Sequence, residues 1–496
     1  MYSTATASRV LCASGKLSRH RLPQPARIAS LPTQTQTQTQ TRLFTITCRA
    51  AYAAVPLPPA RSGSGTDFDA LVVGAGAGGV TAAALLSKRG YRTLLVEAKE
   101  RIGGRASTRP IDGFLVNTGA LVIELDGAVA KTYEEVGLPL SLHEPRRAAT
   151  VLRVGRRDFN VVENLAGVAR NILPSVFASA SRMLPYFRPE KGESTRSWLN
   201  KFTRSRAIHH LIDNVLGAMF AARSDEIPAE AFLHYFVKDT SYKRIGLPPG
   251  GTIEVWKPLA NYVETTGGQV WLNSTVSKLT FGPDGLVTGA IVRKSEGSEV
   301  QVTSKVTVSN IGPLGTVRLA GADNLPGGYA EEIKRWSDPA AIITVHFASQ
   351  QPLATFPCLA IFSKSRRMVY AGNFSAPELH RAPKGWYLYC GASVPVPARG
   401  QFDVEEEKAL LLQDLRDHFP GFEKAKILAI DVTAHDWPAQ RAVTCSDQPQ
   451  TTAVANLFNV GDGAKPWASG GTAACAWTGQ IVAEMVTKQF PLTTKD

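Results

Sequence analysis

The residues of this sequence best suited to chemistry are the glycines of the run GAGAGG, at 74–79, and a glutamate that follows them, Glu97. Gly74 permits a sharp turn, Gly76 lets the backbone approach a pyrophosphate, and Gly79 lets a helix pack closely on a strand. A helix that begins here presents unpaired N–H groups and the positive end of its dipole to phosphates. A carboxylate at the position of Glu97 can accept both ribose hydroxyls of an adenosine. The pattern predicts a dinucleotide site.

The elements around these residues decide whether the pattern has meaning, since glycine-rich turns are common and a lone GxGxxG is weak evidence. Residues 70–73 are a short, valine-rich apolar run of the kind found in a buried parallel strand. Small residues at 80–87 predict a helix that Gly90 ends, and 93–96 predicts a second strand. Because strand, helix and acid all stand at the required distances, the dinucleotide interpretation is favoured over an ordinary turn.

The residues after Glu97 indicate which dinucleotide. They read AKERIGGR and end in Gly103, Gly104 and Arg105. This stretch resembles the ExxxxxGGR extension of FAD-dependent enzymes of the amine oxidase and phytoene desaturase superfamily. The resemblance implies FAD as the cofactor, with the glycine pair and Arg105 on its pyrophosphate side. An exposed glycine turn is the alternative, and the spacing from Glu97 makes it the poorer interpretation.

Two later stretches carry the same resemblance, at 247–279 and 456–486. In the family, Gly461 and Asp462 contact the ribityl chain and pyrophosphate of FAD. The run SGGT, ending at Thr472, then precedes a helix expected over 473–486. The positive end of that helix would face the N1–C2=O side of the flavin, where reduced flavin carries negative charge.

The resemblance also implies contacts between these motifs. A hairpin turning at 112–113 leads to Gly119 and Ala120, small residues expected beside the flavin ring. The backbone at Val276 is expected at the adenine edge. The full set of expected cofactor-binding residues is Gly74, Gly76, Gly78, Gly79, Glu97, Ala98, Gly104, Arg105, Gly119, Ala120, Val276, Gly461, Asp462, Gly471 and Thr472.

A catalytic acid or base is not assigned from the sequence. The candidates by residue type are His143, Glu144, His435, Asp436 and Arg441. None has a partner at a diagnostic spacing. The six cysteines include no CxxC pair, so the sequence predicts neither a metal site nor a disulfide framework.

The expected fold class is α/β, with an FAD-binding doubly wound (Rossmann-like) domain and an inserted α+β substrate domain. Residues 127 to about 245 have a mostly helical pattern. The expected segments are 1–66, transit peptide and linker; 67–130, 246–314 and 426–490, the FAD-binding domain; and 131–245 and 315–425, the substrate domain.

Charge is concentrated at the N-terminus. Residues 1–66 hold eight Lys or Arg and no Asp or Glu, which leaves 47 basic and 42 acidic residues in the remainder, a balance of +5. An acid-free segment rich in arginine, serine and threonine predicts an organellar transit peptide, mitochondrial or plastid, while a disordered tail is the alternative. The mildly basic remainder carries no nucleic-acid-binding motif, and no nucleic-acid partner is expected.

Three functions follow from the resemblance. The first is hydride transfer between flavin and a C–C or C=C bond of a hydrophobic substrate, polyene or isoprenoid, as in phytoene desaturases and carotenoid isomerases. The others are amine oxidation, and a non-catalytic escort like the Rab GDP-dissociation inhibitors. Oxygen and quinone both remain as electron acceptors. The apolar stretch 165–187, interrupted by two arginines and two prolines, fits helices of the substrate domain or a surface that dips into a membrane.

Overall fold

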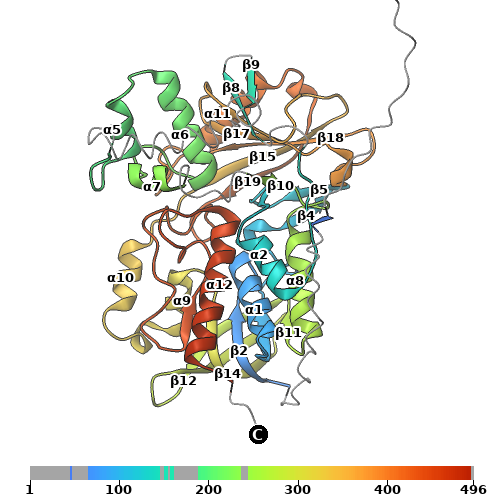
Figure 1. The fold of residues 1–496 in the computed structure, drawn as a ribbon. Helices are drawn as coiled ribbons and strands as arrows, with labels where there is room; N and C mark the ends of the chain where they lie inside the picture. The colour runs from blue at the N-terminus through green and yellow to red at the C-terminus, as the bar shows by residue number, and fades with distance from the viewer. Residues whose placement is uncertain are drawn as a thin grey trace, which may run out of the picture. The chain divides into compact units, whose positions relative to one another are not determined.

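The computed structural model describes residues 45–46, 65–145, 150–154, 157–160, 188–235 and 244–492. Contacts between residues divide the chain into Met1–Arg42 and Leu43–Asp496, and all the described residues belong to the second unit. Two large sheets organise that unit, the first in the lower half of Figure 1 and the second in the upper half.

The first sheet has a parallel core. In spatial order its strands are β11 (Gln269–Trp271), β3 (Thr93–Val96), β2 (Asp67–Val73), β14 (Glu299–Ser309), β13 (Val287–Lys294) and β12 (Ser274–Phe281), with β20 (Leu457–Asn459) also paired to β14. β11, β3, β2, β14 and β20 run parallel, and β13 and β12 are antiparallel additions. β2 is apolar on both faces because Ala70 and Val72 face one core while Leu71 and Val73 face the other.

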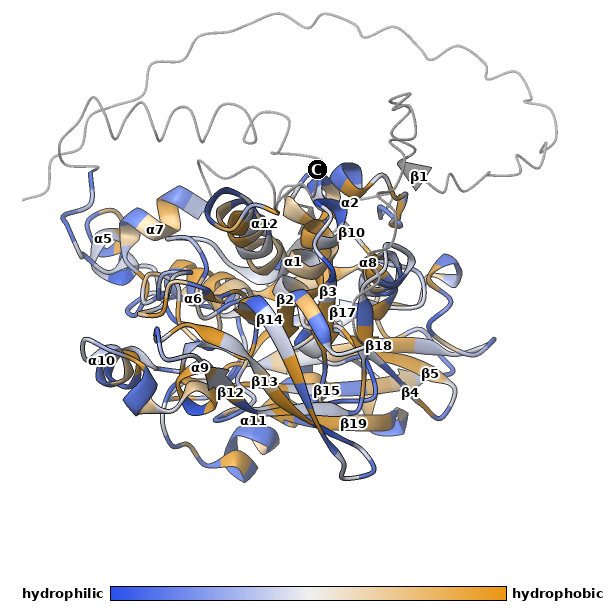
Figure 2. Ribbon diagram, turned by 90° about the horizontal axis from the view of Figure 1, so that it is seen from below, coloured by the Kyte–Doolittle hydropathy of each residue, from blue (hydrophilic) through white to orange (hydrophobic). Residues whose placement is uncertain are grey.

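Helices cover both faces of this sheet. On the face of the first core lie α1 (Ala77–Lys88), α2 (Ala128–Val136), α8 (Ile253–Thr265) and α12 (Gly471–Gln489). On the other face lie α9 (Pro313–Ala320) and α10 (Tyr329–Trp336). Figure 2 shows apolar residues on α1 in the interior and hydrophilic ones on the peripheral α10. The sheet is therefore doubly wound.

The second sheet is mainly antiparallel. Its order is β19 (Lys426–Thr433), β15 (Ile342–Ser349), β18 (Tyr387–Ser393), β17 (Met368–Asn373), β16 (Leu359–Phe362), β8 (Thr150–Val154) and β9 (Arg157–Asn160), with β16 and β8 parallel. α6 (Arg206–Phe220) packs on one face and α11 (Val404–His418) on the other. Residues of α6 and of β15, β16 and β17 line the cavity described below.

The remaining elements are short. They are the strand pairs β1 (Thr45–Ile46) with β7 (Leu140–Ser141), β6 (Ile123–Glu124) with β10 (Ile245–Gly246) and β4 (Thr108–Ile111) with β5 (Phe114–Asn117), and the helices α5 (Thr195–Asn200) and α7 (Ala229–Leu233). The hairpin predicted at 112–113 is confirmed, since Asp112 and Gly113 both have positive φ angles between β4 and β5.

A buried polar group sits inside the second sheet. His346 on β15 is 3% exposed, and its Nε2 lies 3.6 Å from Asp431 Oδ2 on β19, too far for a hydrogen bond. Asp431 instead accepts a 2.6 Å hydrogen bond from Arg109 on β4. Burial, together with the positive charges of Arg381 and Arg109, lowers the pKa of His346 to about 3. The imidazole is therefore neutral at physiological pH.

Three of the expected segment boundaries need correction. The first piece does not end at 130, because α2 runs to Val136 and packs on α1 and α12. The second substrate-domain piece does not start at 315, because α9 and α10 pack against the first sheet. The third FAD-domain piece does not start at 426, because β19 pairs with β15 in the second sheet. In each case a long-range contact, which local sequence patterns do not encode, decides the membership.

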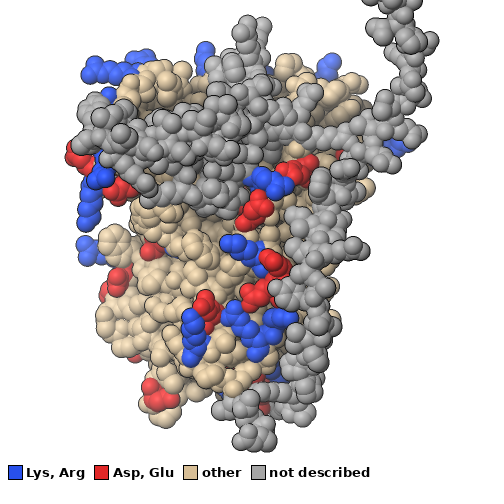
Figure 3. Space-filling model, in the orientation of Figure 1, with Lys and Arg blue, Asp and Glu red and all other residues tan. Residues whose placement is uncertain are grey.

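The mostly helical pattern expected for 127–245 is also wrong in part, since β8 and β9 extend the second sheet. The stretch 165–187, expected either inside the substrate domain or at a membrane, lies outside the described residues. Among the helices that the structure does describe, none is long and apolar enough to cross a bilayer. Figure 3 shows basic and acidic side chains interspersed on the described part of one face.

Candidate active site

One cavity of about 480 Å³ extends from the turn between β2 and α1 to the second sheet. Cavities of this size are typical of small-molecule and cofactor sites. Its walls come from the three separate chain segments that build the first sheet and its helices. At its far end they come from α6 and the strands β15, β16 and β17. The cavity therefore joins the dinucleotide motif to the second sheet.

The glycine turn has the geometry that its sequence predicts. Gly74 has φ = +95°, and α1 begins directly after Gly76, with no side chain capping it. A Cβ on Gly79 would lie 2.1 Å from the carbonyl oxygen of Gly74, and one on Gly78 would lie 2.9 Å from the backbone nitrogen of Gly461. The first turn of α1 therefore packs tightly while its N–H groups, which have no intrahelical acceptors, face the cavity.

Glu97 is held beside the glycine turn, at the same end of the cavity. Its Oε2 accepts a 2.8 Å hydrogen bond from the Ala75 backbone, and its Oε1 accepts one of 2.9 Å from the Lys99 backbone. Each carboxylate oxygen can accept a further hydrogen bond. Val276 lines the cavity next to this carboxylate because the backbone N–H of Ser274 bonds the Glu97 carbonyl oxygen at 2.9 Å. The arrangement can receive a ribose and its base.

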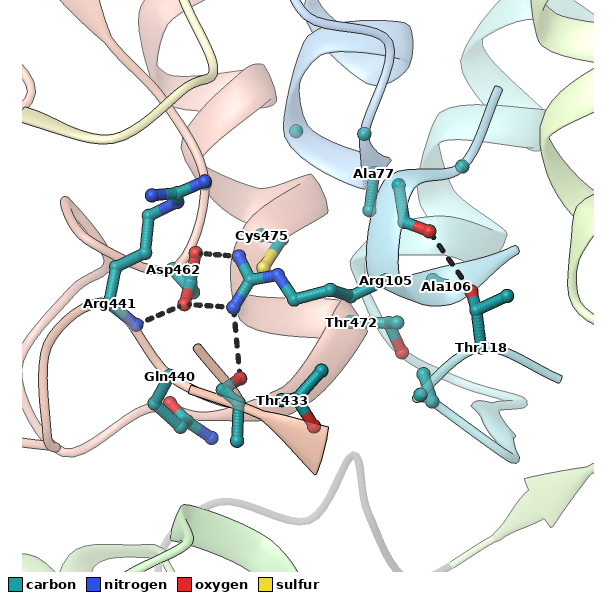
Figure 4. Close-up of a pocket in the computed structure, with 18 of the residues that line it drawn as sticks. Ala77, Arg105, Ala106, Thr118, Thr433, Gln440, Arg441, Asp462, Thr472 and Cys475 are labelled. Carbon is teal, nitrogen blue, oxygen red and sulfur yellow. Dashed lines mark hydrogen bonds and ion pairs between the residues drawn. The ribbon is translucent and has the colours of Figure 1, made fainter. Parts of the chain in front are cut away.

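Arg105 and Asp462 form a bidentate pair in the middle of the cavity wall (Figure 4). The two guanidinium nitrogens donate to the two carboxylate oxygens at 2.8 and 2.5 Å, and Nη1 also donates to the carbonyl oxygens of Pro438 and Ala439 at 2.9 Å. Burial alone would raise the pKa of Asp462, but the charge and hydrogen bonds of Arg105 hold it well below its ordinary value. The pair ties the first motif to the C-terminal one.

The next part of the wall is built from small residues and the start of α12. A Cβ on Gly119 would lie 2.4 Å from the carbonyl oxygen of Arg105, so only glycine fits there. Gly471 and Thr472, in the first turn of α12, line the cavity together with Ala120. The helix dipole therefore directs its positive end at whatever occupies this part of the cavity.

At the far end of the cavity, which we call the substrate lobe, none of the described lining residues is charged. It is lined by Gly217, Ala218, Met219, Tyr235, Ile342, Thr344, Leu359, Ile361 and Tyr370. Trp467 and Trp477, the tryptophans that follow Gly461 in the sequence, are about half exposed and do not line the cavity. Among the described residues that line the lobe, the aromatic ones are two tyrosines from other parts of the chain.

Fourteen of the fifteen expected cofactor-binding residues line this cavity, and the exception is Gly79, which packs beneath the turn. Of the acid–base candidates, Arg441 lines it, whereas His143, Glu144, His435 and Asp436 do not. Sequence reasoning missed several wall residues, namely Asn310, Glu124, Trp437, Gln440 and Cys475.

Two of the missed residues have defined contacts. Asn310 donates from its side-chain amide to the Gly74 carbonyl oxygen at 3.2 Å, just after β14 ends. Trp437 has Lys99 Nζ 3.3 Å from its ring centroid. The run SNIGP at 309–313, at the end of β14, is the available signal for Asn310, whereas the contact of Trp437 has no local signature.

Comparison with known proteins identifies the family. Residues 77–483 match the family described as flavin containing amine oxidoreductase. The chain belongs to this family. Its members carry flavin, and the glycine turn, the tethered Glu97 and the start of α12 fit such a group along one cavity. The chain is accordingly a flavin-dependent oxidoreductase, which disfavours the escort hypothesis.

The curated relatives of this chain include a phytoene desaturase and a phytoene dehydrogenase. The chain is 24% identical over 265 residues to 15-cis-phytoene desaturase, chloroplastic/chromoplastic, of Solanum lycopersicum, covering 47% of this chain and 44% of the relative. It is 28% identical over 217 residues to phytoene dehydrogenase of Streptomyces griseus, covering 40% and 41%. The chain spans about half the length of the curated relatives it matches. The predicted superfamily is confirmed.

Solved structures show the same fold. An oxidoreductase from Methanosarcina mazei superposes with a TM-score of 0.73 at 23% identity, over 84% of this chain and all of the other. Putrescine oxidase superposes with a TM-score of 0.64 at 16% identity, over 86% of this chain and 99% of the other. At these identities the likeness establishes the fold alone, and the expected α/β, Rossmann-like class is confirmed.

Proposed function

We propose that this oxidoreductase holds FAD in the cavity and transfers a hydride between the flavin and a C–C or C=C bond of a hydrophobic substrate, of polyene or isoprenoid type. A site for an adenosine ribose at Glu97, joined to a phosphate-binding turn at Gly76, favours the dinucleotide over a mononucleotide flavin. When bound, the flavin supplies the two-electron redox chemistry, and the protein supplies binding and electrostatics.

The observation that carries the proposal is the uncharged substrate lobe. Its wall is made of aliphatic, small and hydroxyl-bearing side chains from α6 and the second sheet. A long apolar ligand gains free energy from burial there, about 25 cal/mol per Å² of apolar surface removed from water. A cationic or anionic ligand in the lobe would lose its hydration without finding a compensating charge on the described lining residues.

The chain's own residues have three tasks in this reaction. The start of α12, at Gly471 and Thr472, stabilises negative charge on the reduced ring. The packed glycines and the Arg105–Asp462 pair fix the cofactor relative to the lobe. The apolar lobe excludes water from the carbon atoms that exchange the hydride.

Amine oxidation is the second candidate, and a specific residue favours it. Glu124 is buried in the cavity wall beside the start of α12, where its Oε1 lies 3.5 Å from the position of a Cβ on Gly471. A carboxylate in that place could attract an ammonium group. The family description also includes amines. Because Glu124 lies outside the substrate lobe, an amine would use a different part of the cavity from a polyene.

The electron acceptor and the cellular address belong to the same proposal. A desaturase would pass electrons to a quinone, whereas an amine oxidase would pass them to oxygen. A substrate of this type resides in membranes, which favours peripheral contact with a bilayer and no nucleic-acid partner.

The acid-free residues 1–66 favour import into a plastid or mitochondrion. A fluorescent fusion of residues 1–66 tests the address.

Reduction and reoxidation of the flavin test the proposed function. Bound flavin in the purified chain is reduced photochemically without air, and its absorbance is followed after mixing with oxygenated buffer. We expect slow reoxidation in air, faster reoxidation by a quinone, and anaerobic reduction by an isoprenoid polyene but not by amines. Reoxidation within seconds and reduction by amines would contradict the proposal in favour of amine oxidation.

A matched pair of variants on α6 tests the role of the substrate lobe. Met219→Glu places a carboxylate in the lobe and should abolish reaction with the polyene while the flavin absorbance remains. Ile208→Glu, on the same helix but 45% exposed, should react like the wild type. Equal activity of both variants would show that the substrate does not occupy the lobe.

A further inference from the structure

Arg441 lines the cavity, and its guanidinium group has no hydrogen-bond or ion-pair partner among the described residues. Its backbone nitrogen donates to Asp462 at 2.6 Å, but its side chain has neither a hydrogen bond nor an ion pair with any described residue. In Figure 4 the guanidinium points away from the Arg105–Asp462 pair. The side chain passes so close to Gly312 that a Cβ there would lie 2.4 Å from Arg441 Cδ.

Arg105, the arginine that the sequence resemblance places on the pyrophosphate, is already engaged. It makes four hydrogen bonds to the chain's own acceptors, two of them to Asp462. Asp462 attracts both arginines, but its single negative charge balances only one of their two positive charges. The charges at this part of the wall therefore sum to one uncompensated positive charge, that of Arg441.

The other charged groups near Arg441 do not supply the missing negative charge. Asp436 is exposed and pairs with Arg318 of α9 at 3.1 Å. Burial, followed by repulsion from Arg105, lowers the pKa of Arg441 to about 10. A half-buried cation in such surroundings is stabilised by an anionic ligand.

The position of Arg441 indicates which anion. It lines the cavity together with Gly76 and Gly104, the residues of the phosphate-binding turn and the glycine pair. Gly312, which it touches, lies two residues after Asn310, whose side-chain amide donates to Gly74. Gly312 and Asn310 thus connect Arg441 to the glycine turn that precedes α1.

We propose that Arg441 is the cation that binds the pyrophosphate of the dinucleotide, and that Arg105 serves instead to hold the C-terminal motif against the first one. This inference rests on the proposed function, since it takes FAD as the ligand. It assigns to the two arginines different tasks, one in ligand binding and one in folding, and these tasks are separable by experiment.

Ligand titrations of the full-length apoprotein test the assignment. FAD, ADP and adenosine are titrated into the wild type, Arg441→Met, Arg441→Lys and Arg318→Met. Arg441→Met should weaken FAD and ADP by about 10- to 100-fold, the value of one charge-assisted hydrogen bond, and leave adenosine unchanged. Arg441→Lys should recover part of the loss, because it keeps the charge. Arg318→Met, which removes a neighbouring surface arginine, should match the wild type.

Thermal unfolding of the apoproteins gives a readout independent of binding. Arg441→Met should melt at or above the wild-type temperature, because it removes an uncompensated cation. A melting temperature several degrees below that of the wild type, or an equal loss of adenosine and ADP affinity, would make Arg441 a structural residue and overturn the inference. If Arg441→Met binds FAD like the wild type, the inference fails while the proposed function stands. If the wild type binds neither FAD nor ADP, the proposed function itself fails.

Discussion

The Arg105–Asp462 pair should be the strongest tie between the first and last motifs of the chain. The two residues are separated by 357 positions and share two hydrogen bonds, while Arg105 adds two bonds to the loop before Arg441. Their side chains are 21% and 11% exposed. Burial alone would lower the pKa of Arg105, yet Asp462 raises it. The environment thus favours both charges only when both residues are present.

The magnitude follows from this geometry. Removing one member of a fully buried ion pair costs about 3–5 kcal/mol, because the other charge is left uncompensated. With the partial exposure of Arg105, we expect about 2–4 kcal/mol of unfolding free energy for Asp462→Asn or Arg105→Met alone. The double variant leaves no unpaired charge, so it should cost about 2 kcal/mol less than the sum of the two single costs.

A double-mutant cycle measures this coupling. Urea unfolding of the four proteins is followed by tryptophan fluorescence, for which Trp437 is a local reporter because Arg105 lies 6.0 Å from its ring. The matched control is the exposed pair Glu484–Lys488 on α12, 2.6 Å apart, whose coupling should stay below about 0.5 kcal/mol. If the coupling energy between the Arg105 and Asp462 substitutions is as small as that of the control cycle, the two effects are additive and the reasoning is refuted.

Three further predictions concern single residues. Gly79→Ala should disrupt the turn and abolish flavin retention, because the new Cβ would lie 2.1 Å from the Gly74 carbonyl oxygen. The control Gly65→Ala, whose Cβ would have no atom within 4 Å, should leave folding and flavin retention unchanged. Circular dichroism and flavin absorbance compare the two variants, and a Gly79→Ala protein that retains flavin would contradict the packing argument. Glu97→Gln should weaken FAD binding by about tenfold in a fluorescence titration, because it loses a charged acceptor for the ribose. An unchanged affinity would show that the adenosine does not bind beside Glu97. The pKa of His346 is lowered to about 3 from an ordinary value of 6.5, so the stability that its neutral form contributes is present above pH 6.5 and is lost as the pH falls towards 3. His346→Gln should therefore lose less stability between pH 6.5 and 4 than the wild type, and parallel melting curves of the two would contradict this assignment.

The sequence predicts those parts of the fold whose signals are local. The strand at 93–96 has the expected bounds, and α1 begins three residues before the expected 80. These elements follow from hydrophobic runs, helical periodicity and glycine punctuation, which nearby residues determine. For the same reason the glycines of the turn and Glu97, which belong to one motif, could be predicted to lie close together, and Glu97 lines the same cavity as Gly74, Gly76 and Gly78.

The parts that were missed depend on pairing between distant residues. β19 belongs to the second sheet only because β15 lies beside it, and its own residues would suit either sheet. The donors of Arg105 are directed at Asp462 by tertiary packing, so a motif alone could not show that Arg441 is the arginine left unengaged. The substrate lobe is assembled from α6 and three strands that no sequence motif connects.

The central claim is that FAD binds in one cavity lined by residues from Val73 to Cys475. Identifying the cofactor in the purified protein tests this claim most directly. Purified full-length protein is denatured, and the released flavin is identified by chromatography and quantified against the chain. The account predicts one FAD per chain, and a rise in melting temperature when FAD, but not FMN, is added to the apoprotein. A folded protein that contains no flavin and whose melting temperature FAD leaves unchanged would contradict it.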